Sequence, residues 1–290
     1  MPSSTRVTPL LRNRLARLAF FFVGLVLFYG PFALVARLVG ALVPGSFAAN
    51  TLSDTHTICM RMPIGWLAQP WMLGSFGTNL LYLVPVIVLP VAAIALSPLF
   101  CGWLCPAGAF PEFLSRIVPD RFKFDLHGKA PLVPLRYGFF TGLLLAPFVT
   151  TSICCAYCNF TQMQNIASAA FGNPGPLLFI SSTGLITMAI WLLPLGMFIK
   201  GGRGWCLFLC PAGALMSLAS GATSRFPWLK RIRHDASACG SCATCEDLCP
   251  VRAIDVADDG AVSVNQYLCN GCADCVKACP TGAFRYGGAR

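Results

Sequence analysis

Two cysteine runs near the C-terminal end have a spacing suited to iron–sulfur chemistry. They span residues 239–250 and 269–280, and both follow the pattern C-x2-C-x2-C-x3-C-P. This pattern holds [4Fe–4S] clusters, because the three closely spaced thiols of a run can reach one cubane. The fourth cysteine lies too far along the chain and serves the cluster of the other run. Zinc sites or disulfides are the alternative, but neither needs the third cysteine or the trailing proline.

The exchange of fourth cysteines predicts two ligand sets. The first set comprises Cys239, Cys242, Cys245 and Cys279. The second set comprises Cys269, Cys272, Cys275 and Cys249. Short β-rich stretches at 253–256 and 261–264 flank an Asp259-Gly260 turn, which predicts a hairpin between the runs. We therefore expect residues 234–290 to form a two-cluster, ferredoxin-like α+β domain that moves electrons singly.

A second motif occurs twice in the first three quarters of the chain. Residues 101–109 and 206–214 both read C-x3-C-P-A-G-A, which indicates an internal repeat. At this spacing the two thiols of a motif lie one helical turn apart on one face. Two such pairs would supply four thiolates for a third [4Fe–4S] cluster, namely Cys101, Cys105, Cys206 and Cys210. The alternative is that these are buried structural cysteines without reactivity.

A third group of cysteines has no repeat pattern. It comprises Cys59, Cys154, Cys155 and Cys158. The group could bind a fourth cluster or a metal, or it could form disulfides, and the spacing alone does not separate the two. A disulfide between adjacent Cys154 and Cys155 would be strained, whereas Cys158 shares a helical face with both. We therefore expect a redox or metal site.

The composition predicts an integral membrane protein. Of the 290 residues, 56% are apolar and only 11% are charged, and the mean hydropathy is +0.67. Soluble domains carry about a quarter charged residues. Four stretches match the length of about 20 residues that crosses a bilayer, at 18–43, 78–100, 132–153 and 176–199. The expected fold class is thus an α-helical membrane domain of four spans, at 18–233, between a basic N-terminus (1–17) and the ferredoxin-like domain (234–290).

The charge distribution predicts how such a protein would be oriented. Residues 1–17, 107–131 and 200–233 are rich in arginine and lysine, whereas 44–77 and 154–175 contain only Arg61. The positive-inside rule then places both termini and the ferredoxin-like domain in the cytoplasm of a bacterial cell, with the protein in the inner membrane. Residues 212–223 are too short to cross and are expected to be interfacial or re-entrant. Orientation also explains the formal net charge of +10, so nucleic acid is not an expected partner.

Other redox cofactors have no motif in the chain. Only three histidines are present and there is no C-x-x-C-H, so we expect no haem. No glycine-rich nucleotide-binding loop occurs. The segment Ser220-Gly-Ala-Thr223 superficially suggests flavin attachment, but Ser217 stands where an acidic residue is expected, so we expect no covalent flavin.

Four predicted spans, two C-x3-C-P motifs and a C-terminal two-cluster domain together resemble the NapH/NosR-type membrane ferredoxins, with MauN- and RdxA-type proteins as further relatives. The resemblance implies a membrane component that takes electrons from quinol and passes them to a periplasmic redox partner. The chain has no room for the periplasmic flavin domain of NosR-type proteins. His56 is the tentative proton acceptor of a quinol site, because imidazole titrates near neutrality. Nearby Asp54 and Arg61 are more readily explained as solvated loop residues.

Two functions are compatible with these motifs. The first is an electron-transfer subunit of a quinol dehydrogenase-type system, in which no catalytic residue is assigned. The second is a maturation factor that reduces a metal or cofactor of a partner enzyme during assembly. An immature partner enzyme in cells lacking the protein would favour the second, and lost electron flux with intact partner cofactors would favour the first.

Overall fold

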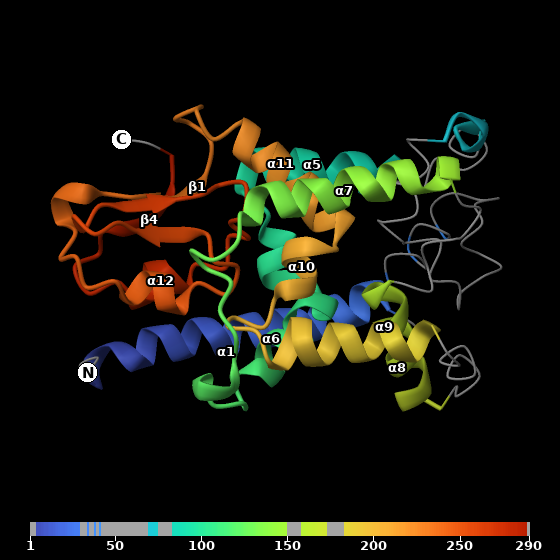
Figure 1. The fold of residues 1–290 in the computed structure, drawn as a ribbon, viewed down its shortest axis with the longest axis horizontal. Coiled ribbons are helices and arrows are strands. Elements are labelled where there is room, and N and C mark those ends of the chain that lie inside the picture. The colour runs from blue at the N-terminus through green and yellow to red at the C-terminus, as the bar shows by residue number, and fades with distance from the viewer. Residues whose placement is uncertain are drawn as a thin grey trace.

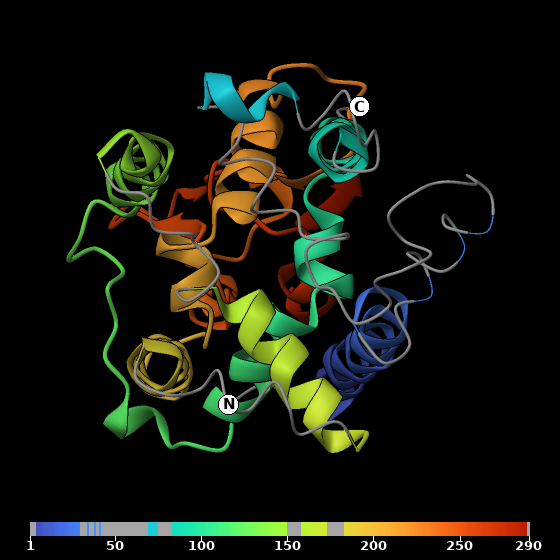
Figure 2. The same cartoon turned by 90° about the vertical axis from the view of Figure 1, so that its right-hand side faces the viewer.

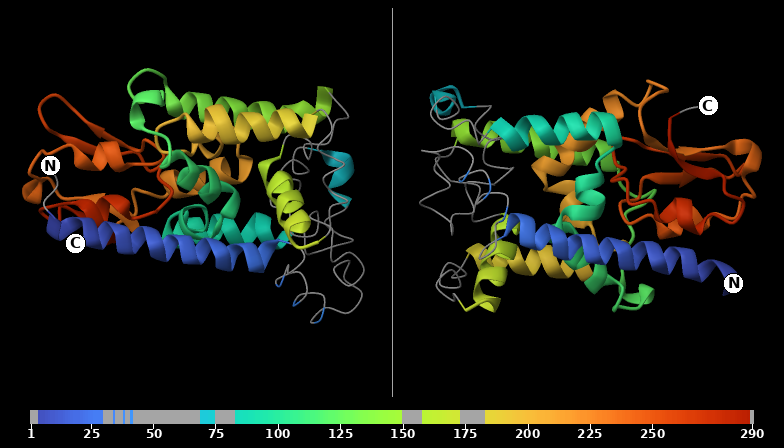
Figure 3. Two further views of the ribbon diagram at one scale, coloured as in Figure 1. Left: turned by 90° about the horizontal axis from the view of Figure 1, so that it is seen from below. Right: turned by 180° about the vertical axis from the view of Figure 1, so that it is seen from behind.

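The structure is a computed structural model that describes residues 4–29, 34, 38, 41, 69–74, 83–149, 158–172 and 183–288. Helices fill one part of the molecule and a small α+β unit lies at one end (Figure 1). The first helix, α1 (Ser4–Phe28), runs beside both parts, as Figure 3 shows from below and behind. The N-terminal helix is thus placed to connect the two parts physically.

The longer helices after α1 lie roughly along the long axis of the molecule and are seen nearly end-on in Figure 2. They are α5 (Leu83–Leu96), α7 (Leu132–Val149) and α9 (Thr183–Leu192). Two more helices, α8 (Asn159–Ala170) and α11 (Pro211–Ala222), pack among them. Short 3-10 turns occur at Pro70–Met72, Asp120–Phe122 and Ala236–Ala238.

The predicted membrane fold class is wrong for this structure. Among the described residues, no helix combines the length and the apolar character needed to cross a membrane. Helix α5 ends at Leu96, where Ser97 takes a positive φ of 67°, and α9 passes after Leu192 into a π-helical turn (Leu193–Met197). Both are shorter than the roughly 20 residues of a span. The predicted spans at 18–43, 78–100, 132–153 and 176–199, and the multi-pass location in the inner membrane that depended on them, are corrected accordingly.

The two C-x3-C-P motifs adopt similar backbone conformations, as expected of an internal repeat. Cys101 lies in a π-helical turn (Phe100–Leu104), and Cys206 lies in the short helix α10 (Gly204–Phe208). In each motif the second cysteine is extended, with φ and ψ of −81° and 104° at Cys105 and of −85° and 108° at Cys210. The following proline occupies the first turn of the next helix, where its missing N–H costs nothing. Those helices are α6 (Pro106–Ser115) and α11. The expectation that both thiols of a motif share one helical face is therefore wrong, since each motif bends at its second cysteine.

The α+β unit is built from two small antiparallel sheets and two five-residue helices. Strand β1 (Arg231–His234) pairs with β4 (Phe284–Gly287), with Ile232 opposite Tyr286. Strand β2 (Ile254–Val256) pairs with β3 (Val262–Val264), with Asp255 opposite Ser263. The predicted hairpin between the two cysteine runs is thereby confirmed. Helices α12 (Thr244–Leu248) and α13 (Asp274–Ala278) each begin just before the third cysteine of a run.

One apolar core continues from the α+β unit into the helical part. Its buried members from the unit include Ile232, Ile254 and Phe284, and those from the helical part include Leu132 and Leu207. Burying one aliphatic or aromatic side chain contributes about 1.5–3 kcal/mol. The shared core therefore fixes the unit against the helices, and the two groups of cysteine motifs lie at a defined position relative to each other.

Candidate functional site

The second predicted cysteine set comes together across the two runs. Burial raises the pKa of the Cys275 thiol well above its ordinary value, and the charges of Cys272, Cys269 and Cys249 raise it further. Burial likewise raises the pKa of Cys269 to about 12, with a contribution from Cys249. Cys249 therefore lies beside the second run, although it belongs to the first. Buried thiols with such pKa values lose their protons when a metal coordinates them.

The first predicted set lies nearer the surface. Cys242 is exposed and Cys239 and Cys279 are partly exposed, whereas Cys245 is buried. Burial raises the pKa of Cys245 to about 11, and the charges of Cys242 and Cys279 contribute. The fourth cysteine of the second run thus approaches the first run. The two sets differ chiefly in depth, since all four cysteines of the second set are buried.

The four C-x3-C-P cysteines also face one another. Burial raises the pKa of Cys101 well above its ordinary value, and the charges of Cys105, Cys210 and Cys206 raise it further. Two helix starts surround them, because Gly213 N–H at the start of α11 donates to Cys210 Sγ at 3.3 Å. The fold therefore brings together two motifs that lie far apart in the sequence.

Two buried arginines adjoin this group of thiols. Arg203 donates to the carbonyl oxygen of Cys101 at 2.6 Å, and Arg136 donates to that of Cys206 at 3.5 Å. A side chain added at Gly108 would meet Arg203 Nη1 at 2.9 Å and Cys206 Sγ at 3.1 Å, so the guanidinium and the thiol share one small space. Among the described residues, Arg136 Nε and Arg203 Nη2 are buried without a hydrogen-bond partner.

These features fit an anionic metal cluster. Four thiols are the donor set of a [4Fe–4S] cluster, and the unpaired nitrogens of buried guanidinium groups favour negative charge beside them. Arg136 has no carboxylate partner in the part of the chain that the structure describes, and burial lowers its pKa while the charges of Tyr137, Cys101 and Cys210 oppose that effect. No three potential ligands among the described residues lie close enough to hold a single metal ion.

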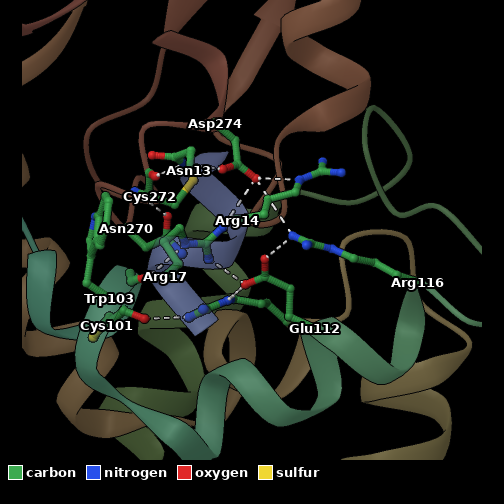
Figure 4. Close-up of polar contacts among 12 residues, drawn as sticks. Asn13, Arg14, Arg17, Cys101, Trp103, Glu112, Arg116, Asn270, Cys272 and Asp274 are labelled. Atoms are coloured by element: carbon green, nitrogen blue, oxygen red, sulfur yellow. Dashed lines mark hydrogen bonds and ion pairs between the residues drawn. The ribbon is translucent and has the colours of Figure 1, made fainter. Parts of the chain in front are cut away.

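A buried ion network, which the motifs did not predict, joins the two groups of cysteine sites (Figure 4). Glu112 accepts from Arg203 at 2.6 Å, from Arg17 at 2.8 Å and from Arg116 at 2.5 Å. Asp274 accepts from Arg17 at 3.2 Å and from Arg14 at 3.4 Å. The only sequence signal was Glu112 itself, an acid in a stretch otherwise rich in basic residues.

The ionisation of this network follows from its ion pairs. Burial alone would raise the pKa of Glu112, but the charges of Arg203, Arg17 and Arg116 outweigh burial and lower it to about 2. Burial alone would lower the pKa of Arg17, but Glu112, Cys272 and Asp274 raise it above its ordinary value. All of these groups are therefore charged at neutral pH. Four arginines with two carboxylates leave an excess of positive charge between the cysteine sites.

Several predicted residues lie outside the described part of the chain. These are Cys59, Cys154, Cys155, His56, Asp54 and Arg61. Of the third cysteine group only Cys158 is described, and it is buried in contact with the core that contains Tyr29 and Phe160. The proposals of a fourth site and of His56 as a proton acceptor therefore stay predictions.

Comparison with known proteins identifies two iron–sulfur segments. A family model described as a 4Fe-4S binding domain matches residues 78–125 and 183–234, so each matched part contains one C-x3-C-P motif. A second family model, described as a 4Fe-4S dicluster domain, matches residues 238–283, which contain both C-terminal runs. No solved structure is significantly similar to the chain. The two matches support [4Fe–4S] clusters and an electron-transfer role.

Several curated proteins are similar to this chain. Protein NirI of Paracoccus denitrificans is 28% identical over 198 residues, which cover 63% of this chain and 26% of NirI. Ferredoxin-type protein NapH of Haemophilus influenzae is 28% identical over 211 residues, covering 72% of this chain and 66% of NapH. Regulatory protein NosR of Pseudomonas aeruginosa is 30% identical over 174 residues, covering 58% of this chain and 22% of NosR. The matched segment is thus only about a quarter of NirI and NosR. Together with MauN, these relatives and the two family models support the assignment of this chain to the NapH/NosR-type ferredoxin family.

Proposed function

We propose that this protein is an electron relay with three [4Fe–4S] clusters, two in the ferredoxin-like unit and one at the C-x3-C-P motifs. The observation that carries the third cluster is the convergence of Cys101, Cys105, Cys206 and Cys210 beside two buried arginines. Inert structural cysteines would not explain why two guanidinium groups are buried there with unpaired nitrogens. An anionic cluster accounts for both the thiols and the arginines.

In the ferredoxin-like unit we propose the ligand sets that the spacing predicts. Cys249 joins Cys269, Cys272 and Cys275, and Cys279 joins Cys239, Cys242 and Cys245. The electrostatic contact of Cys249 with the second run, and of Cys279 with Cys245, supports this exchange. When bound, the clusters supply one-electron carriers, and the protein supplies thiolates, burial and counter-charge.

Counting irons tests the number of clusters. Anaerobically purified protein should contain iron and acid-labile sulfide for three clusters. Cys206→Ser should remove about four irons and leave the EPR signals of the ferredoxin-like unit, since that unit has eight thiolates of its own. Cys242→Ser is the matched variant and should alter those signals while leaving the C-x3-C-P signal. Unchanged iron in Cys101, Cys105, Cys206 and Cys210 variants would reduce the relay to two clusters.

The electron donor that we propose is a quinol, and the acceptor is a redox partner protein. The family assignment supports both, and the exposure of Cys242 supports electron exchange with another protein near the first set. A short-chain quinol should reduce the clusters anaerobically in stopped-flow absorbance measurements. Reduction by dithionite without reduction by the quinol would exclude this donor and leave the relay itself intact.

A further inference from the structure

A direct backbone contact joins the C-x3-C-P site to the ferredoxin-like unit. Gly102, which follows Cys101, lies so close to the second run that an added Cβ would be 2.4 Å from the Asn270 carbonyl oxygen and 3.1 Å from the Cys272 nitrogen. Cβ atoms essentially never approach other atoms this closely, so only glycine fits here without displacement. Next to it, Trp103 Nε1 donates to the Gly271 carbonyl oxygen at 3.1 Å. The residue after one proposed ligand thus contacts the backbone of another.

The buried ion network holds both sides of this contact, and Figure 4 shows Asn13, Arg17, Cys101 and Cys272 around it. On the C-x3-C-P side, Arg203 donates to the Cys101 carbonyl and Arg17 Nε donates to the Gly102 carbonyl at 3.0 Å. On the other side, Asn13 Nδ2 donates to the Cys272 carbonyl at 3.2 Å and to Asp274 at 2.6 Å. Since Arg17 also pairs with Asp274, helix α1 fastens the two backbones together.

The second point of close approach also leads to the second ligand set. An added Cβ at Gly201, just before the second C-x3-C-P motif, would be 2.3 Å from the Pro250 carbonyl oxygen. Pro250 follows Cys249, which belongs to the second set. By contrast, an added Cβ at Gly240, in the first set, would meet only Thr281 of the same unit. The first set is turned toward the surface, where Cys242 is exposed.

We infer that the C-x3-C-P site exchanges electrons with the Cys249/Cys269/Cys272/Cys275 set through the contact of Gly102 with Asn270 and Cys272, and that the Cys239/Cys242/Cys245/Cys279 set occupies the outer end of the relay. This inference rests on the three-cluster function proposed above. One electron leaves the cysteine site on one side and reduces the site on the other, without bond formation or proton transfer. Arg17, Arg203 and Asn13 are positioning residues, because they hold the backbones that flank the cysteines.

The experiment compares two glycine variants of the full, cluster-loaded chain. Gly102→Ala forces the contact apart, whereas Gly138→Ala in α7 meets nothing within 4 Å and serves as the control. In fully reduced wild-type protein, we expect the EPR signal of the C-x3-C-P site to show magnetic interaction with a neighbouring reduced cluster. Gly102→Ala should lose this interaction with its iron content intact, and Gly138→Ala should keep it.

A milder variant covers the case in which Gly102→Ala fails to load its third cluster. Trp103→Phe removes only the hydrogen bond to Gly271 and should weaken the same interaction. Full iron content with an unchanged interaction in both variants would overturn the inference. So would an interaction that Cys242→Ser abolishes and Cys272→Ser leaves intact, because the order of the relay would then be reversed. A wild-type iron content for only two clusters would instead remove the proposed function on which the inference rests.

Discussion

The ferredoxin-like unit and the C-x3-C-P repeat both assemble four-cysteine sets from two copies of a motif, but they do so by different means. In the unit, Ala243 and Ala273 take positive φ values of 54° and 61° immediately before α12 and α13. These local bends present neighbouring thiols in one direction. In the repeat, the two halves meet only because separate helices pack together around buried charges. The comparison teaches that equivalent donor sets can depend on local backbone geometry or on tertiary packing.

The surroundings of the two kinds of set differ accordingly. The second ferredoxin-like set lies in an apolar core with Ile254, Leu268 and Phe284. The C-x3-C-P set is bordered by Arg136 and Arg203, and the Glu112 network lies behind it. Changes to charged groups should therefore affect the repeat far more than the unit.

The largest effect is expected for Glu112→Gln, because the substitution leaves three arginines without their shared carboxylate. Removing one partner of a buried ion pair costs about 3–5 kcal/mol in the free energy of unfolding. The matched control is Glu246→Gln in the unit, where a partly exposed carboxylate pairs with His127 at 2.9 Å. That change should cost about 0–1 kcal/mol. Chemical denaturation measures both, and equal losses would contradict the contrast between the two regions.

The pH dependence of the Glu112 contribution sharpens the same contrast. Because folding lowers its pKa from 4.5 to about 2, the ionised carboxylate stabilises the folded state above the unfolded value. The contribution, about 3 kcal/mol by linkage, is fully present above pH 4.5 and is lost as the pH falls toward 2. The difference in stability between the wild type and Glu112→Gln should therefore be constant from pH 8 to 5. A difference that declines steadily across this range in thermal melts would refute the assignment.

A smaller effect is expected where the two regions touch at Gly201. Gly201 has a φ of 86° and would place an added Cβ against Pro250, whereas Gly128 has a φ of 66° with nothing within 4 Å. Alanine at either position incurs the backbone cost of about 1–2 kcal/mol. Only Gly201→Ala adds overlap, worth about 1–3 kcal/mol more. Equal unfolding free energies for the two variants would show that the contact between the regions can relax.

Arg136→Met should shift the reduction potential of the C-x3-C-P site downward by tens of millivolts. The reduced cluster carries more negative charge, so removal of a buried cation disfavours reduction. Arg12→Met changes an exposed residue and should leave the potential unchanged. Potentiometric EPR titration measures both variants, and an upward or absent shift for Arg136→Met would place this arginine away from the cluster.

The smallest effect is expected for Asp120→Asn, which breaks a pair with Lys123 at 2.7 Å outside both regions. The aspartate is largely exposed, so the loss should be about 0–1 kcal/mol. A loss comparable to that of Glu112→Gln would mean that burial does not govern the strength of these ion pairs.

Prediction of the helices from the sequence was only partly successful. Apolar stretches correctly located helical segments around α5, α7 and α9, but hydropathy did not show where those helices end. Ser97 with its positive φ and the π-helical turn at Leu193–Met197 interrupt the stretches. Likewise, the basic N-terminus was interpreted only through its charge. In the structure, Arg17 and Asn13 are buried and bind the ferredoxin-like unit.

The sequence by itself determined the donor chemistry, the hairpin and the family, because these depend on residue type and short-range spacing. The positions of the eight cysteines and the Asp259-Gly260 turn are features of neighbouring residues. Only the tertiary structure decided that Cys101 and Cys206 face each other, that Gly102 contacts Cys272, and that Glu112 joins Arg17 to Arg203. Such contacts join residues far apart in the chain, and they depend on how whole helices pack, which no local pattern of residues encodes.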